Sequence, residues 1–181
     1  MASFQFCPQC ASRLEYRTIG GFERGLCPDS ACGYTNWDNP TPVVAAVVEY
    51  DGGLILARNA AWRPGTFALI TGFLEKNEDP AQAVAREVNE ELGLQVVQPP
   101  HFIGHYPFER MNQLIIAYHV KTEGEVVLNE ELAEWRYVRF DRAKYWPSST
   151  GLALRDWLHS QGYDPQASGP LNARPETPPA A

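Results

Sequence analysis

Three glutamates between residues 72 and 94 are the side chains of this chain best placed to do chemistry. Glu87, Glu90 and Glu91 fall within an arc of roughly 100° if the segment is an α-helix. The apolar stripe beside them repeats every four residues and consists of Val84, Val88 and Leu92. Carboxylates next to a buried stripe are expected to be half-buried, where like charges either raise their pKa values or bind a cation.

The commonest explanation of a glutamate-rich helix is an acidic face in contact with water. In this segment the carboxylates adjoin the apolar edge instead of opposing it, which favours a functional site. Oxygen ligands in an acidic cluster suit Mg²⁺ or Mn²⁺, usually shared with a substrate phosphate. Arg86 lies four positions before Glu90 and is expected to pair with its carboxylate. The residues therefore predict a divalent metal site on a helix.

Residues with strong capping preferences predict where this helix begins and ends. Asp79 is a good N-cap residue, Pro80 suits the first helical position, and Gln82 completes the spacing of a capping box. Gly93 is expected to close the helix in the left-handed conformation. A helix framed in this way holds the three glutamates at fixed positions relative to one another.

The same segment resembles the Nudix box at every defined position. Its matching residues, in the order and spacing of that motif, are Gly72, Glu78, Arg86-Glu87, Val88, Glu90-Glu91, Gly93 and Leu94. Nudix hydrolases cleave nucleoside diphosphates that are linked to another moiety. The resemblance implies an α/β fold, a Nudix α/β/α sandwich with a mixed sheet. It also implies that Glu87 and Glu91 bind the catalytic Mg²⁺ or Mn²⁺, with Glu90 as a third ligand.

The resemblance implies further catalytic residues around the box. The backbone carbonyl of Thr71 has the position that often completes the metal shell. Residues 129–135 resemble the acidic segment that precedes a strand in NADH pyrophosphatases, and Glu131 aligns there with an extra metal ligand. Glu90 or Glu131 is expected to serve as the general base. Arg86 is expected to orient a carboxylate within the catalytic group.

All four cysteines lie in the first 32 residues, as Cys7-Pro-Gln-Cys10 and Cys27-Pro-Asp-Ser-Ala-Cys32. Thiolate pairs at such spacing typically build a structural, tetrahedral Zn²⁺ site. Two disulfides are the alternative, but they need an exporting context that this N-terminus does not indicate. The segment resembles the zinc ribbon before the Nudix domain of NADH pyrophosphatases and some plant flavin-dinucleotide hydrolases. Its second pair is spaced by four residues instead of their usual two, which predicts a wider second loop.

The substrate-binding residues are expected in residues 105–113, where NADH pyrophosphatases carry Ser-Gln-Pro-Trp-Pro-Phe-Pro. Only the Pro-Phe pair of that motif is present here, so the resemblance does not extend to a preference for NADH. Tyr106 and Phe108 are expected to stack against a base. Arg110 and Asn112 are expected to contact a phosphate or a polar edge of the substrate.

Patterning along the 181 residues predicts two domains and a tail. Residues 1–38 are expected to form the zinc ribbon, residues 39–162 the Nudix domain, and residues 163–181 a flexible, proline-rich tail. Besides the box helix, a helix is expected over residues 150–160. Strands are expected at 43–50, 54–58, within 62–70, and at 95–97, 102–106, 114–121 and 135–140.

Composition restricts the partners of the chain. A net charge of −7 and a pI near 5.1 argue against general affinity for nucleic acid, so a small nucleotide is the expected substrate. No apolar run is long enough to span a membrane, and no secretory signal is visible, which favours a cytoplasmic location. The resemblance to NADH pyrophosphatases makes a homodimer possible.

The sequence therefore predicts a metal-dependent hydrolase that cleaves the pyrophosphate of NAD(H), FAD, ADP-ribose or a nucleotide sugar. The alternative is a ligand-sensing module, or one that binds protein or nucleic acid, with a zinc ribbon and a Nudix fold. The intact carboxylates of the box favour the hydrolase, because a sensor can dispense with them. The ribbon has nearly balanced charges, which also disfavours a nucleic-acid module.

Overall fold

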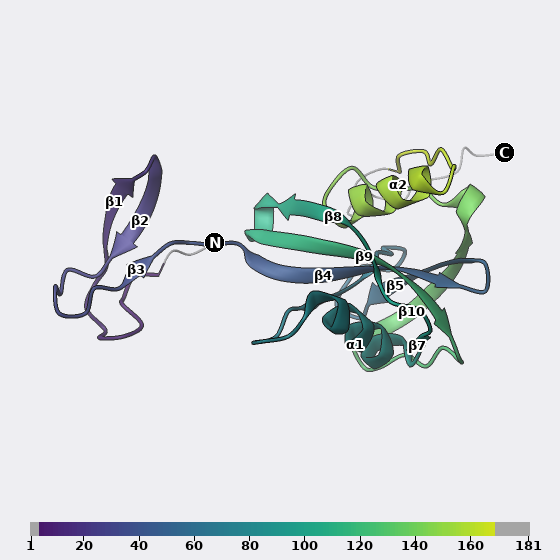
Figure 1. The fold of residues 1–181 in the computed structure, drawn as a ribbon, viewed down its shortest axis with the longest axis horizontal. Helices are drawn as coiled ribbons and strands as arrows, with labels where there is room; N and C mark the ends of the chain where they lie inside the picture. The colour runs from purple at the N-terminus through teal and green to yellow at the C-terminus, as the bar shows by residue number, and fades with distance from the viewer. Residues whose placement is uncertain (1–3, 169–181) are drawn as a thin grey trace. The chain divides into compact units, whose positions relative to one another are not determined.

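The structure, a computed structural model, describes residues 4–168 and divides into two compact units between Pro40 and Thr41. The first unit is a small antiparallel sheet in the order β1-β2-β3 (Figure 1). Its strands are β1 (Glu15–Ile19), β2 (Phe22–Leu26) and β3 (Thr35–Asn36). The four cysteines lie in the turns that flank these strands, as a ribbon requires.

The second unit is built on a seven-stranded mixed sheet in the order β10-β5-β4-β9-β7, with β6 paired to β4 and β8 to β9. Only β4 and β9 are parallel within this sheet, with Thr41 opposite Gln113 and Tyr50 opposite Thr122. The strands are β4 (Thr41–Tyr50), β5 (Gly53–Asn59), β6 (Ile70–Phe73), β7 (Gln95–Val96), β8 (His101–Phe108), β9 (Gln113–Glu123) and β10 (Leu132–Arg139).

The apolar run of β4 is buried on both faces of the sheet, as expected for a central strand. Successive side chains of a strand point to opposite faces, so alternate residues of this run pack into two separate cores. One core contains Val44, Ala46 and Val48 with Val84, Val88 and Leu92 of α1 (Pro80–Leu92). On the other face Val43, Ala45 and Val47 pack in the clusters that contain Ala153, Leu154, Trp157 and Leu158 of α2 (Thr150–Ser160).

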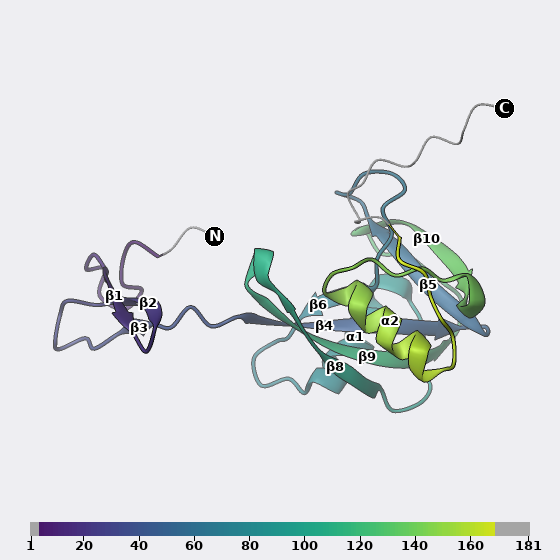
Figure 2. The same ribbon diagram turned by 90° about the horizontal axis from the view of Figure 1, so that it is seen from above.

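The two helices therefore cover opposite faces of the mixed sheet, as the two views in Figures 1 and 2 show. This arrangement confirms the predicted α/β fold with helices on both sides of a mixed sheet. Neither helix of the described residues 4–168 is long and apolar enough to cross a membrane.

The predicted ends of α1 are confirmed by its capping geometry. The Asp79 side chain accepts hydrogen bonds from the backbone N–H groups of Ala81 at 2.8 Å and Gln82 at 3.3 Å. Gly93 has a φ of 69°, and its N–H donates to the carbonyl of Asn89 at 2.9 Å. These bonds satisfy backbone groups that every helix end leaves without an internal partner.

Two segments differ from the sequence-based expectation. A turn and a strand leading into the box were expected over residues 62–70. The strand is β6 and begins only at Ile70, and residues 60–69 form a loop joined to β5 by an isolated bridge between Ala57 and Ala68. The tail expected over residues 163–181 is described only as far as residue 168. Up to that point it is packed, because Tyr163 lies against Phe140 and residues 166–168 pair with Tyr145. Residues 169–181 lie outside the part that the structure describes.

Candidate functional site

One pocket of the second unit collects the carboxylates of the box, and we call it the carboxylate pocket. Its volume is about 340 Å³. All five residues expected to bind the divalent metal line it, namely Thr71, Glu87, Glu90, Glu91 and Glu131. Glu131 comes from the start of β10, so the sheet brings it to the helix from 40 positions further along the chain. Glu75 and Gln113 also line this pocket, and neither was expected there.

Burial and mutual repulsion perturb the carboxylates in this pocket. Glu91 is only 8% exposed, and burial raises its pKa to about 8, with added repulsion from Glu87, Glu131 and Glu90. Burial also raises the pKa of Glu87, although the neighbouring Arg86 opposes this shift. A cation between these groups would remove the repulsion and favour their ionised forms. The donor set consists of oxygen atoms alone, which fits Mg²⁺ or Mn²⁺.

Arg86 holds the carboxylates of the box in place. Its guanidinium donates to Glu78 at 2.7 and 3.0 Å, to Glu87 at 2.7 Å and to Glu90 at 2.9 Å. The ion pair lowers the pKa of Glu78, whose other role is to accept the backbone N–H of Glu75 at 3.0 Å. The planar donor fork of arginine can serve several carboxylates at once, which a lysine cannot do. This geometry makes Arg86 a positioning residue for the cluster.

Gly72 is required by the close approach of Glu87. A Cβ atom at position 72 would lie 1.8 Å from the carboxyl carbon of Glu87, well inside any van der Waals contact. The glycine at this position of the motif therefore has a steric reason in this chain, because β6 passes directly beside the helix here. Any side chain at position 72 would displace a carboxylate of the pocket.

A second pocket, which we call the aromatic pocket, adjoins the first. The two pockets share Val43, Thr71 and Gln113 in their walls, and the aromatic pocket has a volume of about 200 Å³. Three aromatic side chains line it from separate parts of the chain, namely Trp62, Phe108 and Trp146. Arg110 lies over the ring of Phe108 at 5.4 Å. The backbone and side chains at the start of α2 close the pocket with Ser148, Ser149 and Thr150.

Of the four residues expected to bind substrate, Phe108 and Arg110 line the aromatic pocket, and the other two lie elsewhere. Tyr106 lies in β8 just before Pro107 and Phe108, and its hydroxyl donates to Asp156 of α2 at 2.8 Å. Burial raises the pKa of this phenol. Asn112 turns the hairpin between β8 and β9 with a φ of 48°, and its carbonyl accepts the N–H of Thr41 at 2.9 Å.

The aromatic pocket also contains residues other than the four expected to bind substrate. Trp62 follows β5 in an irregular loop, and Gln113, at the end of the segment expected to bind substrate, begins β9. Residues 146–150 lead into α2, which begins at Thr150, and in the sequence they are equally consistent with a pocket wall and with a hydrophobic cap. These residues come together only through the parallel pairing of β4 with β9 and the packing of α2. Their place in the pocket depends on contacts between distant segments, and the spacing of residues within one segment cannot predict such contacts.

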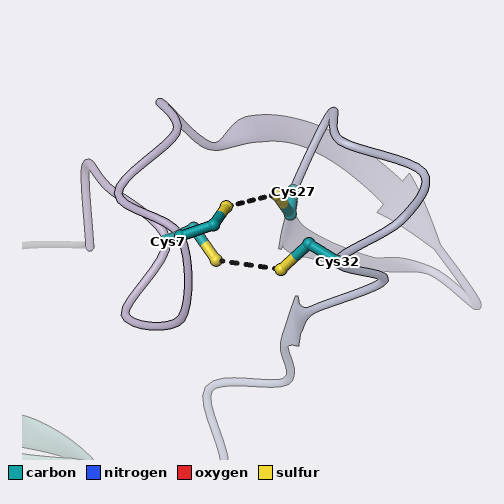
Figure 3. Close-up of side chains that lie close together, drawn as sticks. Cys7, Cys27 and Cys32 are labelled. Atoms are coloured by element: carbon teal, nitrogen blue, oxygen red, sulfur yellow. Dashed lines mark hydrogen bonds between the residues drawn. The ribbon is translucent and has the colours of Figure 1, made fainter.

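The four cysteine sulfur atoms of the first unit lie within 4.8 Å of one another. The Sγ–Sγ distance is 3.6 Å between Cys7 and Cys32 and 3.4 Å between Cys10 and Cys27 (Figure 3). All four are free thiols, so the disulfide alternative is not found. Four Zn–S bonds of about 2.3 Å in a tetrahedron place the sulfur atoms about 3.8 Å apart. The cysteine cluster therefore has the donors and the spacing that suit Zn²⁺.

Two backbone turns present these sulfur atoms. In the first turn the N–H of Ala11 donates to the carbonyl of Cys7 at 2.9 Å. In the second, the N–H groups of Cys32 and Gly33 both donate to the carbonyl of Asp29, at 3.0 and 3.2 Å. The Asp29 side chain also accepts the N–H of Ala31 at 2.9 Å. The second turn thus accommodates the two additional residues between its cysteines.

The fold and the box together define a class of protein. The profile of the NUDIX domain matches residues 39–159. The chain therefore belongs to the Nudix hydrolase family. Among curated proteins, it is similar to the "NAD-capped RNA hydrolase NudC" of Stutzerimonas stutzeri, with 29% identity over 84% of this chain and 54% of that protein. The protein of the same description from Mycobacterium bovis is 30% identical over 69% of this chain and 39% of its own length.

The chain thus spans about half the length of the curated relatives that it matches. Among solved structures, a NUDIX hydrolase from Nitrosomonas europaea matches 92% of this chain and 98% of its own, with a TM-score of 0.72 and 22% identity. The MutT protein of Methanosarcina mazei matches 68% of this chain with a TM-score of 0.54 and 22% identity. At these identities the structural matches establish the fold alone.

Proposed function

We propose that the chain hydrolyses the pyrophosphate of a nucleoside diphosphate that is linked to a second small moiety. The observation that carries this proposal is the pairing of two adjoining pockets. One contains oxygen ligands for divalent cations, and the other offers aromatic faces with one cation at its edge. A pyrophosphate at the shared wall would place its charge beside the metal and a ring in the aromatic pocket.

In this proposal Mg²⁺ or Mn²⁺ is held by Glu87, Glu90, Glu91, Glu131 and the carbonyl of Thr71. A cation held there would neutralise charge on the phosphate oxygens and lower the pKa of a nearby water. Glu90 or Glu131 accepts the proton of the attacking water. Glu90 is the more exposed of the box glutamates, with 54% of its side chain accessible, so it can reach such a water. Arg86 keeps Glu87 and Glu90 oriented throughout.

The aromatic pocket suits one ring system of a dinucleotide. Its volume of about 200 Å³ lies below the range of about 300–1,000 Å³ for pockets that enclose a whole drug-sized ligand. NAD(H), FAD, ADP-ribose and nucleotide sugars are the candidate substrates. The name of the curated relatives adds the NAD cap of an RNA to these candidates. The acidic net charge favours the free dinucleotides, because a long RNA backbone would be repelled.

The second part of the proposal is that the cysteine cluster binds a structural Zn²⁺ ion. Cys7, Cys10, Cys27 and Cys32 supply four sulfur ligands, so a bound zinc has no open position for water. Burial raises the pKa of Cys27 to about 12, whereas hydrogen bonding to Ser12 lowers that of Cys10 to about 6. Zn²⁺ binds thiolates, so a cation at the cluster would favour the ionised form of all four cysteines.

A substrate panel with Mn²⁺ tests the proposed function. The purified chain is incubated with NADH, NAD⁺, FAD, ADP-ribose, a nucleotide sugar and a short NAD-capped RNA, and phosphorus NMR identifies the products. We expect two phosphomonoesters from at least one dinucleotide, and none when EDTA replaces Mn²⁺. If every compound stays intact while ligands still bind, the sensing alternative is favoured.

A further inference from the structure

The loop after β5 carries Trp62 into the aromatic pocket, and its conformation depends on one arginine. Arg58, the penultimate residue of β5, donates from Nη1 to the carbonyl of Trp62 at 2.9 Å. The same nitrogen lies 3.4 Å from the carbonyl of Asn59. The side chain of Arg58 is only 14% exposed, although its bond to the Trp62 carbonyl lies at the surface.

Glu134 of β10 fixes the other side of the Arg58 guanidinium. Its carboxylate accepts from Nε of Arg58, and the two residues are opposite each other in the antiparallel register of β5 and β10. Glu134 is 41% exposed at its side chain, whereas Arg58 is largely buried. Glu134 thus holds Arg58 from the sheet, while Nη1 of the same guanidinium faces the loop. Arg58 and Glu134 both belong to strands, and the register of β10 shifts between Leu132 and Glu134.

The start of the loop has a separate anchor that does not involve Arg58. The N–H of Ala60 donates to the carbonyl of Glu131 at 2.7 Å, and the N–H of Trp62 donates to the carbonyl of Asn59 at 2.9 Å. Glu131 is itself held through its N–H by the side chain of Asn129 at 3.0 Å. Loss of the Arg58 guanidinium would therefore remove the hydrogen bond to the Trp62 carbonyl, while the hydrogen bonds of Glu131 to Asn129 and Ala60 would remain.

We propose that Arg58 is a positioning residue that, held by Glu134, sets the place of Trp62 in the wall of the aromatic pocket. This inference rests on the proposed function, because it assigns to Trp62 a contact with the substrate ring. Arg58 itself lines neither pocket. It acts on substrate affinity through the backbone of Trp62 and leaves the carboxylate pocket as it is. The Arg58–Glu134 pair thus contributes to substrate specificity without lining either pocket.

Arg58→Lys is the informative variant, because lysine keeps the charge but cannot serve Glu134 and the Trp62 carbonyl with a planar fork. We expect KM for the best dinucleotide of the panel to rise about five- to ten-fold, with kcat changed less than about three-fold. In a Trp62→Ala background the same substitution should change KM less than about two-fold, since its target is gone. Arg139→Lys is the control, because Arg139 ends β10 and pairs with Asp141 of the following turn without bonding the loop.

Hydrogen exchange without ligand provides a readout that is independent of turnover. Arg58→Lys should speed exchange of residues 60–66 at least about five-fold, and Arg139→Lys should not. Unchanged exchange in Arg58→Lys would overturn the proposal, even if the wild-type chain hydrolysed nothing and the proposed function had failed. An equal rise of KM in the wild-type and Trp62→Ala backgrounds would also overturn it, because the effect would then be a general loss of stability.

Discussion

The carboxyl group of Glu91 is almost buried. Its protonation should therefore control the stability of the metal-free protein. Its pKa in the folded chain is raised from 4.5 to about 8. A raised pKa means that the folded state binds the extra proton, so this stabilisation is complete below about pH 4.5 and is lost as the pH rises to about 8. Glu91→Gln removes the titration while keeping the size of the side chain.

We therefore expect Glu91→Gln to unfold like wild type near pH 4 but to be more stable by about 4 kcal/mol near pH 8. Urea unfolding in EDTA at a series of pH values measures this difference. Excess Mg²⁺ should reduce it, because the cation stabilises the ionised wild-type site. If the free energy of unfolding of the two proteins changed with pH in the same way across this range, burial would not raise the pKa of Glu91.

Gly72 gives a second test at the level of single residues. In Gly72→Ala the new methyl group would overlap the carboxyl group of Glu87, so this ligand must move. We expect kcat to fall by about 100-fold, as displacements of about 1 Å in a catalytic group commonly do. Thermal unfolding followed by circular dichroism should show a much smaller effect, since the pocket can absorb the shift. A variant with normal kcat would mean that the position of Glu87 is not critical.

Among the elements, α1 and the central strands could be predicted from sequence because their signals are local. Asp79 and Gly93 mark the ends of α1, and the apolar run of β4 identifies a strand buried on both faces. The loop at residues 60–69 could not be predicted in this way. Its shape depends on Arg58, Glu134 and the carbonyl of Glu131, which join it only after β10 has paired with β5.

The same reasoning explains the mixed outcome at the β8–β9 hairpin. Alternation along a strand correctly puts Tyr106 and Phe108 on one face. It does not show that α2 covers the first of them and leaves the second open to the pocket. That difference depends on the bond between Tyr106 and Asp156, which are 50 positions apart.

Phe108 tests the role assigned to this hairpin. Stacking of a ring on an aromatic side chain is worth about 1–3 kcal/mol, so Phe108→Ala should raise KM about ten-fold or more for a dinucleotide and change kcat little. Phe102→Ala is the matched control, since Phe102 is 45% exposed on the same strand and contacts Tyr118 edge-to-face and His105 at a tilt. Loss of the folded state in Phe108→Ala would instead show that the ring serves packing.

At the scale of the whole molecule, the structure divides between Pro40 and Thr41, and the sequence predicts a boundary after residue 38. Cysteine spacing and the box motif are both contained in short segments, which is why they could be recognised without a structure. The wall that the two pockets share could not be recognised in this way, because its residues come from separate strands. Val43, Thr71 and Gln113 border both pockets and come from β4, β6 and β9.

Zinc should act on the stability of the first unit and not on the chemistry of the second. We expect about one zinc per chain by elemental analysis of protein purified without chelator, and its loss from Cys10→Ser after a brief exposure to EDTA. The variant should unfold at a lower temperature, while kcat of the remaining folded protein stays within about two-fold of wild type. Ser30→Ala, in an exposed turn of the same unit, should keep its zinc. Zinc-free wild-type protein would contradict the site.

The most direct test of the central claim is turnover by Glu91→Gln with saturating Mn²⁺ and the best substrate of the panel. If the carboxylate pocket holds the catalytic cation, kcat should fall by about 1,000-fold or more while circular dichroism shows a folded chain. Glu130→Gln, an exposed neighbour of Glu131, should retain full activity. Turnover of Glu91→Gln within a few-fold of wild type would contradict the account.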